Sequence, residues 1–258
     1  MEAYSQTAKE ARLKVLDLIY SAQTSHIGSN FSCIDILTVL FEKIDLDKDR
    51  FILSAGWKAA SLYYFLWKKG RITEDELNSY CKDGSKWIGL TEPIHPDIPF
   101  SGGSMGMGLP AAVGFALAKK IKKEEGTIYV LESDGAISGG LIWESANLAE
   151  KYKLDNLVVF IDWNKFCAMG DTAEITNLDP EKVTDIFKSF GWCVYRIDGH
   201  NFNEIEAVLK TKKEEEKPTV IISETIKGKG VKKFEGDNLW HYWHIDKKVY
   251  EEALAELH

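Results

Sequence analysis

An aspartate–glycine pair and a later asparagine are the strongest candidates in this sequence for a binding or catalytic site. Asp134 and Gly135 directly follow the apolar run 127–133, and Asn164 lies just beyond the apolar run 157–162. If these runs are neighbouring parallel strands, the polar side chains lie at the same edge of the sheet. One carboxylate and one amide offer hard oxygens that suit Mg²⁺ or Ca²⁺, with phosphates and water as the remaining ligands. An Asp-Gly pair alone is also typical of a simple turn, but a spacing of one strand–helix–strand unit favours the metal site.

The elements that would position these residues alternate along the chain. Apolar runs predict strands at 51–54, 127–133, 157–162, 194–198 and 219–225. Helical spacing of apolar residues predicts helices at 6–21, 32–41, 59–69, 73–81, 109–123, 141–152, 180–190, 202–211 and 247–257. Alternation of this kind, with almost wholly apolar strands, is typical of a parallel sheet covered on both faces. We therefore predict an α/β fold, a doubly wound parallel sheet with helices on both faces.

Three further segments carry structural expectations. The small residues between 106 and 118 predict a closely packed, buried helix, because they let neighbouring backbones approach. Residues 24–30 are predicted to form a polar break between helices. The segment 87–100 contains Pro93, Pro96 and Pro99 and is predicted to be a loop.

Length and composition exclude several classes of protein. The 258 residues show no linker, so we expect one domain over 1–258. A net charge of −8 argues against a nucleic-acid binder, which needs a basic surface. The sequence has no apolar run long enough to span a membrane and no secretory signal at its start, so we expect no membrane association. The four cysteines lack metal or redox spacing, which favours reduced thiols in the cytoplasm.

Five ordered segments resemble the transketolase family. The stretch from Ser133 to Phe166, with D-G, W-E and D-W-N inside it, is similar to the family's thiamine-diphosphate motif. The other similar segments are TSHIGSNFS (24–32), DRFILSAGW (49–57), GGSMGMG (102–108) and ETIKGKGV with LWH (224–241). The resemblance implies the thiamine-diphosphate-binding fold and its diphosphate domain. It also implies a transferase that moves a two-carbon ketol unit from a ketose to an aldose.

The resemblance assigns metal and cofactor roles to particular residues. Asp134 and Asn164 would hold Mg²⁺ through side-chain oxygens, and Phe166 would add its backbone carbonyl. Gly135 would contact the diphosphate through its N–H group. Two residues, Gly103 and Met105, would lie along the cofactor.

The resemblance also assigns roles to histidines and to one glutamate. His26 and His241 would line the approach to the thiazolium and handle proton transfers and sugar hydroxyls. Glu144 would lie at a subunit interface. His200, in a D-G-H turn, is interpreted as structural.

A complete site would need a second chain. A full-length transketolase is more than twice this length, and its pyrimidine domain has no counterpart here. The resemblance therefore implies the N-terminal subunit of a split transketolase, completed by a C-terminal subunit in an assembly with two copies of each. Without that partner, Met105, Met107, Trp57 and Ile137 would form an open apolar patch.

Some positions depart from the family pattern on the substrate side. Trp57 replaces a histidine that normally reaches the cofactor and donor sugar, and an indole can donate only one hydrogen bond. Ser133 replaces the first glycine of the motif. The loop after His95 is shorter than usual, so the sequence alone does not decide whether His95 reaches the site. We expect an unusual sugar substrate.

Two other functions remain open from the sequence. One is a different thiamine-diphosphate enzyme, such as a 2-oxo acid decarboxylase or dehydrogenase component, although the 102–108 and 224–241 segments favour transketolase. The other is a non-catalytic regulatory paralogue, which Trp57 favours and the retained Asp134, Gly135 and Asn164 oppose.

Overall fold

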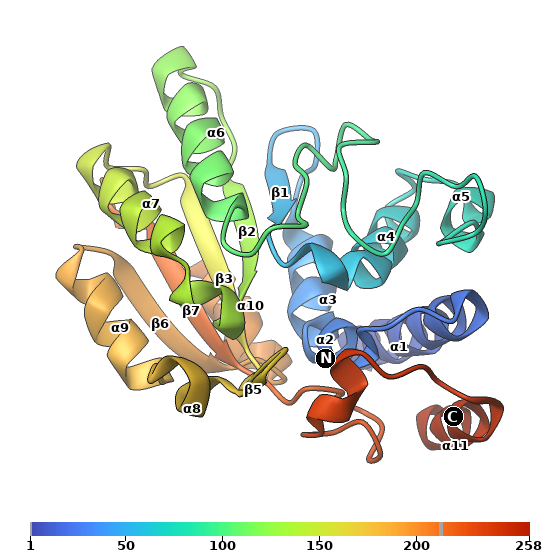
Figure 1. The fold of residues 1–258 in the computed structure, drawn as a ribbon. Coiled ribbons are helices and arrows are strands. Elements are labelled where there is room, and N and C mark those ends of the chain that lie inside the picture. Colours follow the sequence, from blue (N-terminus) through green and yellow to red (C-terminus); the bar gives the residue numbers. More distant parts are fainter. Residues whose placement is uncertain (1, 212–213) are drawn as a thin grey trace.

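A parallel sheet forms the centre of the molecule. The structure is a computed structural model that describes residues 2–211 and 214–258. Within these residues the sheet has five strands in the order β1-β2-β3-β7-β6 (Figure 1). The strands are β1 (Arg50–Leu53), β2 (Ile128–Ser133), β3 (Leu157–Trp163), β6 (Cys193–Asp198) and β7 (Thr219–Glu224). All neighbours are parallel, so the predicted α/β fold class is confirmed.

Helices cover both faces of this sheet (Figure 1). One face carries α6 (Gly108–Lys122), α7 (Gly140–Lys151) and α9 (Pro180–Ser189). On the other side lie α3 (Ile34–Lys43) and α10 (Phe202–Lys210), with α1 (Glu2–Ala22) and α4 (Ala59–Lys68) packed against α3. The three shortest helices of the described residues are α2 (Ile27–Ser32), α5 (Glu74–Asn78) and α8 (Thr172–Thr176), and α11 (Lys247–Leu257) packs against α1. Three 3₁₀ turns, η1 (Gly56–Lys58), η2 (Asp134–Ser138) and η3 (Asn238–His241), and a hairpin of β4 (Phe166–Cys167) and β5 (Gly170–Asp171) complete the fold.

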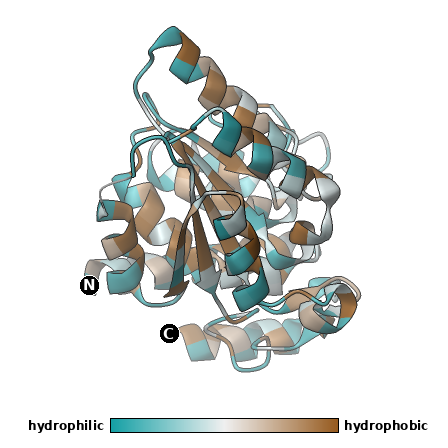
Figure 2. Ribbon diagram, turned by 90° about the vertical axis from the view of Figure 1, so that its left-hand side faces the viewer, coloured by the Kyte–Doolittle hydropathy of each residue, from teal (hydrophilic) through white to brown (hydrophobic). Residues whose placement is uncertain are grey.

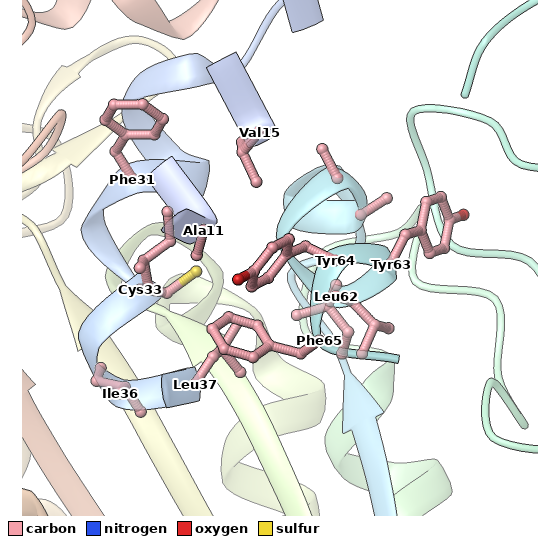
Figure 3. Close-up of a cluster of buried hydrophobic side chains, with 14 of the residues drawn as sticks. Ala11, Val15, Phe31, Cys33, Ile36, Leu37, Leu62, Tyr63, Tyr64 and Phe65 are labelled. Carbon is pink, nitrogen blue, oxygen red and sulfur yellow. The ribbon is translucent and has the colours of Figure 1, made fainter. Parts of the chain in front are cut away.

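The sheet divides the hydrophobic core into two layers. The strands are the most uniformly apolar elements (Figure 2), and every residue of β3 is buried. Side chains of α1, α3 and α4 meet on one side, where Val15, Leu37 and Tyr64 lie close together (Figure 3). Burial on both faces explains why β2, β3 and β7 lack an alternating polar pattern, whereas the edge strand β6 is partly exposed. A rigid sheet results, and its strand ends are fixed points for the loops that follow.

Two expectations about the helices are wrong for this chain. Residues 27–30 do not form a polar break but belong to the buried helix α2. Burial is tolerated because their polar groups form hydrogen bonds within the protein. Asn30 Oδ1, for example, accepts from the backbone N–H and the hydroxyl of Ser61. Helix α6 is buried on one face only. Its other face exposes Gly114, Phe115, Ala118 and Ile121, because no element of the described chain covers it.

None of the helices in the described part of the chain is long and apolar enough to cross a membrane.

Candidate active site

A cavity of about 270 Å³ opens where β1, β2 and β3 end. Its walls come from loops that follow these strands, from the segment 90–105 and from the segments around α2 and η3. This is the position at which open parallel sheets bind ligands. The lining residues are His26, Ser29, Trp57, Leu90, Gly103, Met105, Ser133, Gly135, Asn164, Phe166, Cys167, Ala168, His241 and Tyr242. The cavity thus brings together all the residues that the sequence assigned to catalysis and cofactor binding.

Asp134 lies buried beside this cavity, at the start of η2. The end of β2 orients it, since the Ser133 hydroxyl accepts a hydrogen bond from the Ala136 N–H group and starts the turn. The Gly135 N–H group donates to Asp134 Oδ1 at 2.8 Å, whereas Oδ2 has no hydrogen-bond partner in the described structure. Burial raises the pKa of Asp134 to about 7, and the nearby Asp162 carboxylate adds to the shift. An orphaned buried carboxylate oxygen is what a bound cation would satisfy.

Asn164 and Phe166 occupy the turn after β3. The parallel register pairs Ser133 with Asp162, so the two strand ends bring Asp134 and Asn164 to the same edge of the sheet. Asn164 Oδ1 accepts a hydrogen bond from the Phe166 N–H group at 3.1 Å. The intervening Lys165 has a left-handed backbone with φ of 73°, which turns the chain sharply enough for this contact. The turn therefore presents an amide and a backbone segment together at the cavity wall.

The donor set fits a cation that also binds a phosphorylated ligand. Among residues 2–211 and 214–258, no three His, Cys, Asp or Glu side chains gather in a way that could hold a metal ion by themselves. Asp134 and Asn164 would thus supply only part of a coordination shell, and Mg²⁺ commonly takes the rest from phosphates and water. Gly135 lines the cavity and packs tightly against β4, because a Cβ there would lie 2.9 Å from the Cβ of Cys167. We conclude that these residues fit a metal–diphosphate group.

Two histidines lie side by side in the cavity wall with their rings in an edge-to-face arrangement. The His26 N–H group of the backbone donates to the carbonyl of His241 at 3.0 Å, and the ring centroids lie 5.1 Å apart. Burial and the charge of Lys227 lower the pKa of His26 to about 4 and that of His241 to about 3. Both imidazoles are therefore neutral at physiological pH.

Lys227 is a functional candidate that sequence reasoning missed. Its ammonium lies 2.9 Å from Nδ1 of His241 and 2.7 Å from Oδ1 of Asn238. Burial lowers the pKa of Lys227 to about 8. A charged ammonium can only donate, so His241 Nδ1 accepts and its proton sits on Nε2. Lys227 belongs to the segment 224–231 that carried the resemblance, but nothing in its type distinguishes it from surface lysines.

A buried ion pair lies beneath the cavity and was also missed. Lys58 and Asp162 are both fully buried, and their side chains form a salt bridge. The Ser32 hydroxyl donates to Asp162 Oδ2 at 2.5 Å, and the Thr225 hydroxyl donates to Oδ1. Although burial opposes ionisation, Lys58 and these hydroxyls hold the pKa of Asp162 below its usual range.

The remaining candidate residues lie outside the cavity. His95 accepts a hydrogen bond from the Asp97 N–H group at 3.2 Å and is not part of the lining. His200 bonds to Asp35 at 2.7 Å and accepts from the Ile226 N–H group at 2.8 Å, as a loop organiser would. Glu144 is exposed on α7.

The expected apolar patch is smaller than predicted. Met105 and Met107 are 55% and 42% exposed, and Trp57 is half-buried. Ile137 is fully buried, because η2 turns its side chain into the core against α6 and α7. Including Ile137 in the patch was therefore wrong.

Comparisons with known proteins agree with this geometry. The family model described as "Transketolase, thiamine diphosphate binding domain" matches residues 3–248. The chain is 34% identical over 270 residues to an apulose-4-phosphate transketolase subunit of Phocaeicola vulgatus, covering 100% of this chain and 94% of that one. It is 35% identical over 266 residues to the 6-deoxy-6-sulfo-D-fructose transketolase subunit SqwG of a Clostridium species, covering 97% and 94%.

Full-length transketolases are also similar. Human transketolase is 31% identical over 272 residues, which cover 100% of this chain and 42% of the human protein. The crystal structure of transketolase from Campylobacter jejuni superposes with a TM-score of 0.93 at 28% identity, covering 100% of this chain and 43% of that one. The similarity therefore includes the whole fold described above and less than half of a full-length enzyme.

Proposed function

The chain belongs to the transketolase family, and we propose that it is the N-terminal subunit of a split transketolase that uses thiamine diphosphate and Mg²⁺. It would transfer a two-carbon ketol unit from a ketose donor to an aldose acceptor. The observation that carries this proposal is the buried, unpartnered Asp134 Oδ2 beside Asn164 and the tightly packed Gly135. A family member with no cofactor has no use for such an arrangement.

Residues at the ends of β2 and β3 would bind the cation and the cofactor. Asp134, Asn164 and the carbonyl of Phe166 would hold the cation, and Gly135 would face the diphosphate, while the ammonium of Lys227 would orient His241. Gly103 and Met105 would lie along the cofactor. Bound thiamine diphosphate supplies a thiazolium that acts as an electron sink.

The histidines would act mainly as hydrogen-bond donors. His241 carries its proton on Nε2, so that at neutral pH it can donate to a sugar hydroxyl or carbonyl oxygen without changing charge. His26 is held beside it by the contact between its backbone N–H and the His241 carbonyl. With pKa values of about 4 and about 3, neither imidazole is a cation that could give up a proton near pH 7.

A second polypeptide completes the proposed enzyme. The two relatives named as subunits are matched over 94% of their length, whereas human transketolase is matched over 42%. We propose a C-terminal partner that carries the pyrimidine domain, in an assembly with two copies of each chain, with Glu144 at a subunit interface. All four cysteines are free thiols, in keeping with a cytoplasmic enzyme.

The substrate is proposed to be an unusual sugar. The two relatives named as subunits carry names that specify apulose-4-phosphate and 6-deoxy-6-sulfo-D-fructose. Trp57 supports this proposal, since it places an indole in the cavity wall where the family pattern has histidine. Trp57→His should therefore broaden or shift the profile of accepted donors, measured as kcat/KM over a donor panel. Identical profiles for variant and parent would show that Trp57 does not set the choice of donor.

Calorimetry tests the proposal most directly. Thiamine diphosphate with Mg²⁺ is titrated into this chain alone and then with its partner subunit. We expect tight binding only with the partner, and we expect Asp134→Ala to abolish it. Asp185→Ala, at an exposed position of α9, is the matched control and should bind normally. Absence of binding in both cases would instead indicate a regulatory paralogue.

A further inference from the structure

Asp162 connects four segments that meet beneath the cavity. It lies at the end of β3, and its oxygens accept hydrogen bonds from Ser32 in α2 and from Thr225 after β7. The ammonium of Lys58, at the end of η1, forms the salt bridge. The fourth connection is to Asn164, two residues further along the chain. Three of these segments carry residues of the cavity lining, namely Ser29 in α2, Trp57 in η1 and Asn164 itself.

Stability alone does not account for the ion pair. Lys58 and Asp162 have no solvent-exposed side-chain surface, so both charges have lost their hydration. Pairs of this kind are often no more stabilising than two apolar side chains of similar volume. A fully buried lysine beside a proposed ligand site therefore calls for a role in positioning.

The contact with Asn164 shows what could be positioned. Asn164 Nδ2 lies 3.4 Å from Asp162 Oδ2 and 3.4 Å from the Ser32 hydroxyl oxygen. Its Oδ1 accepts from the Phe166 N–H group on the other side. An amide has one donating and one accepting end, and only the accepting end can bind a cation. An ionised carboxylate behind Nδ2 holds the amide with its oxygen directed away from Asp162.

We propose that Lys58 is a positioning residue for the divalent cation, acting through Asp162 on the orientation of Asn164. Lys58 supplies the charge that keeps Asp162 in place, and Asp162 supplies the acceptor that fixes the amide. The inference rests on the proposed function, because the cation belongs to it. Lys58 does not contact the cofactor or substrate in this arrangement.

The test separates positioning from folding by using two variants. Lys58→Met keeps the side-chain length and removes the charge, leaving Asp162 unpaired. Lys58→Met/Asp162→Leu removes both charges and fills the space with apolar groups. Arg12→Met is the control, because it breaks a different buried ion pair, with Asp35, outside the cavity. Thermal melting reports stability, and Mn²⁺ titration followed by electron paramagnetic resonance, with thiamine diphosphate and the partner subunit present, reports cation affinity.

The outcomes differ between the two roles. We expect Lys58→Met to lower the melting temperature and weaken Mn²⁺ binding at least tenfold. The double variant should regain the melting temperature while Mn²⁺ binding stays at least fivefold weaker, since Asn164 has lost its acceptor. Arg12→Met should melt earlier and bind Mn²⁺ normally.

Two results would overturn the inference. Wild-type Mn²⁺ affinity in Lys58→Met would show that the ion pair does not influence cation binding. Wild-type Mn²⁺ affinity in the double variant would show that the ion pair contributes only to stability. A parent protein that binds no Mn²⁺ would be a different failure, since it would refute the proposed function itself.

Discussion

Replacing the proposed metal ligand Asp134 by asparagine should stabilise the cation-free chain. The folded structure raises the pKa of this carboxyl from 3.8 to about 7, chiefly through burial. One pKa unit corresponds to about 1.4 kcal/mol, so ionised Asp134 destabilises the folded chain by up to about 4 kcal/mol above pH 7. Asparagine avoids this cost, but its buried NH₂ group lacks an acceptor, which costs about 1–3 kcal/mol. We expect a net gain of about 1–3 kcal/mol for Asp134→Asn at pH 8.

The pH dependence identifies the source of this gain. A raised pKa means that the folded chain holds the proton more tightly than the unfolded chain does. The destabilisation is therefore absent at pH 3.8 and below, grows as the pH rises towards about 7, and is constant at higher pH. Glu132, His26 and His241 also have shifted pKa values, but they titrate in both proteins and cancel in the difference.

Thermal unfolding in a chelator at pH 5, 6, 7 and 8 is the assay. For a chain of this size, each kcal/mol corresponds to about 2–4 °C in melting temperature. The excess of the Asp134→Asn melting temperature over that of the parent should grow with pH. Addition of Mg²⁺, thiamine diphosphate and the partner subunit should reverse this difference, because only the parent binds the cation and is stabilised by it. Asp185→Asn, an exposed control, should show no such trend. A variant less stable than the parent at pH 8, or a pH-independent difference, would refute the reasoning.

Three further outcomes follow from the same structure. Gly135→Ala should weaken thiamine-diphosphate binding at least tenfold, because its Cβ would lie 2.9 Å from that of Cys167; calorimetry checks this, and Cys167→Gly in the same chain should restore part of the affinity. Lys165→Gly should raise stability by about 1 kcal/mol and Lys165→Val should lower it, since φ is 73° at this position; chemical denaturation measures both. Asp35→Leu should destabilise the chain by about 3–5 kcal/mol by stranding Arg12, with cofactor affinity unchanged in calorimetry at low temperature.

The spatial grouping of the proposed ligand residues could be predicted because it depends on local pattern and one topological rule. Asp134, Gly135 and Asn164 each follow a strand whose apolar run is visible in the sequence. Parallel pairing of those strands is enough to bring the three residues to one edge of the sheet. The histidines and Trp57 needed the family resemblance, since no periodicity connects His26 to His241 across 215 positions of the chain.

Lys58 and Lys227 could not be predicted for a different physical reason. A lysine is normally solvated, and its burial depends entirely on which partners the fold brings to it. The partner of Lys58 lies 104 residues away, at the end of another strand. Sequence pattern indicates where strands end, but it does not say which charged groups from other segments meet beneath those ends.

The error on helix α6 has a physical cause that bears on the assembly. Its small residues predict close packing, yet Gly114 and Ala118 are exposed beside Phe115 and Ile121, which are 37% and 72% exposed. A sequence pattern reflects the burial of a residue in the assembled protein. The structure of one chain shows only the burial that this chain provides by itself. The exposed face of α6, together with Met105 and Met107 at the cavity mouth, is therefore the surface that we expect other chains of the proposed assembly to cover. On this reasoning, the small residues of α6 suit close packing against another chain and not against the rest of this chain.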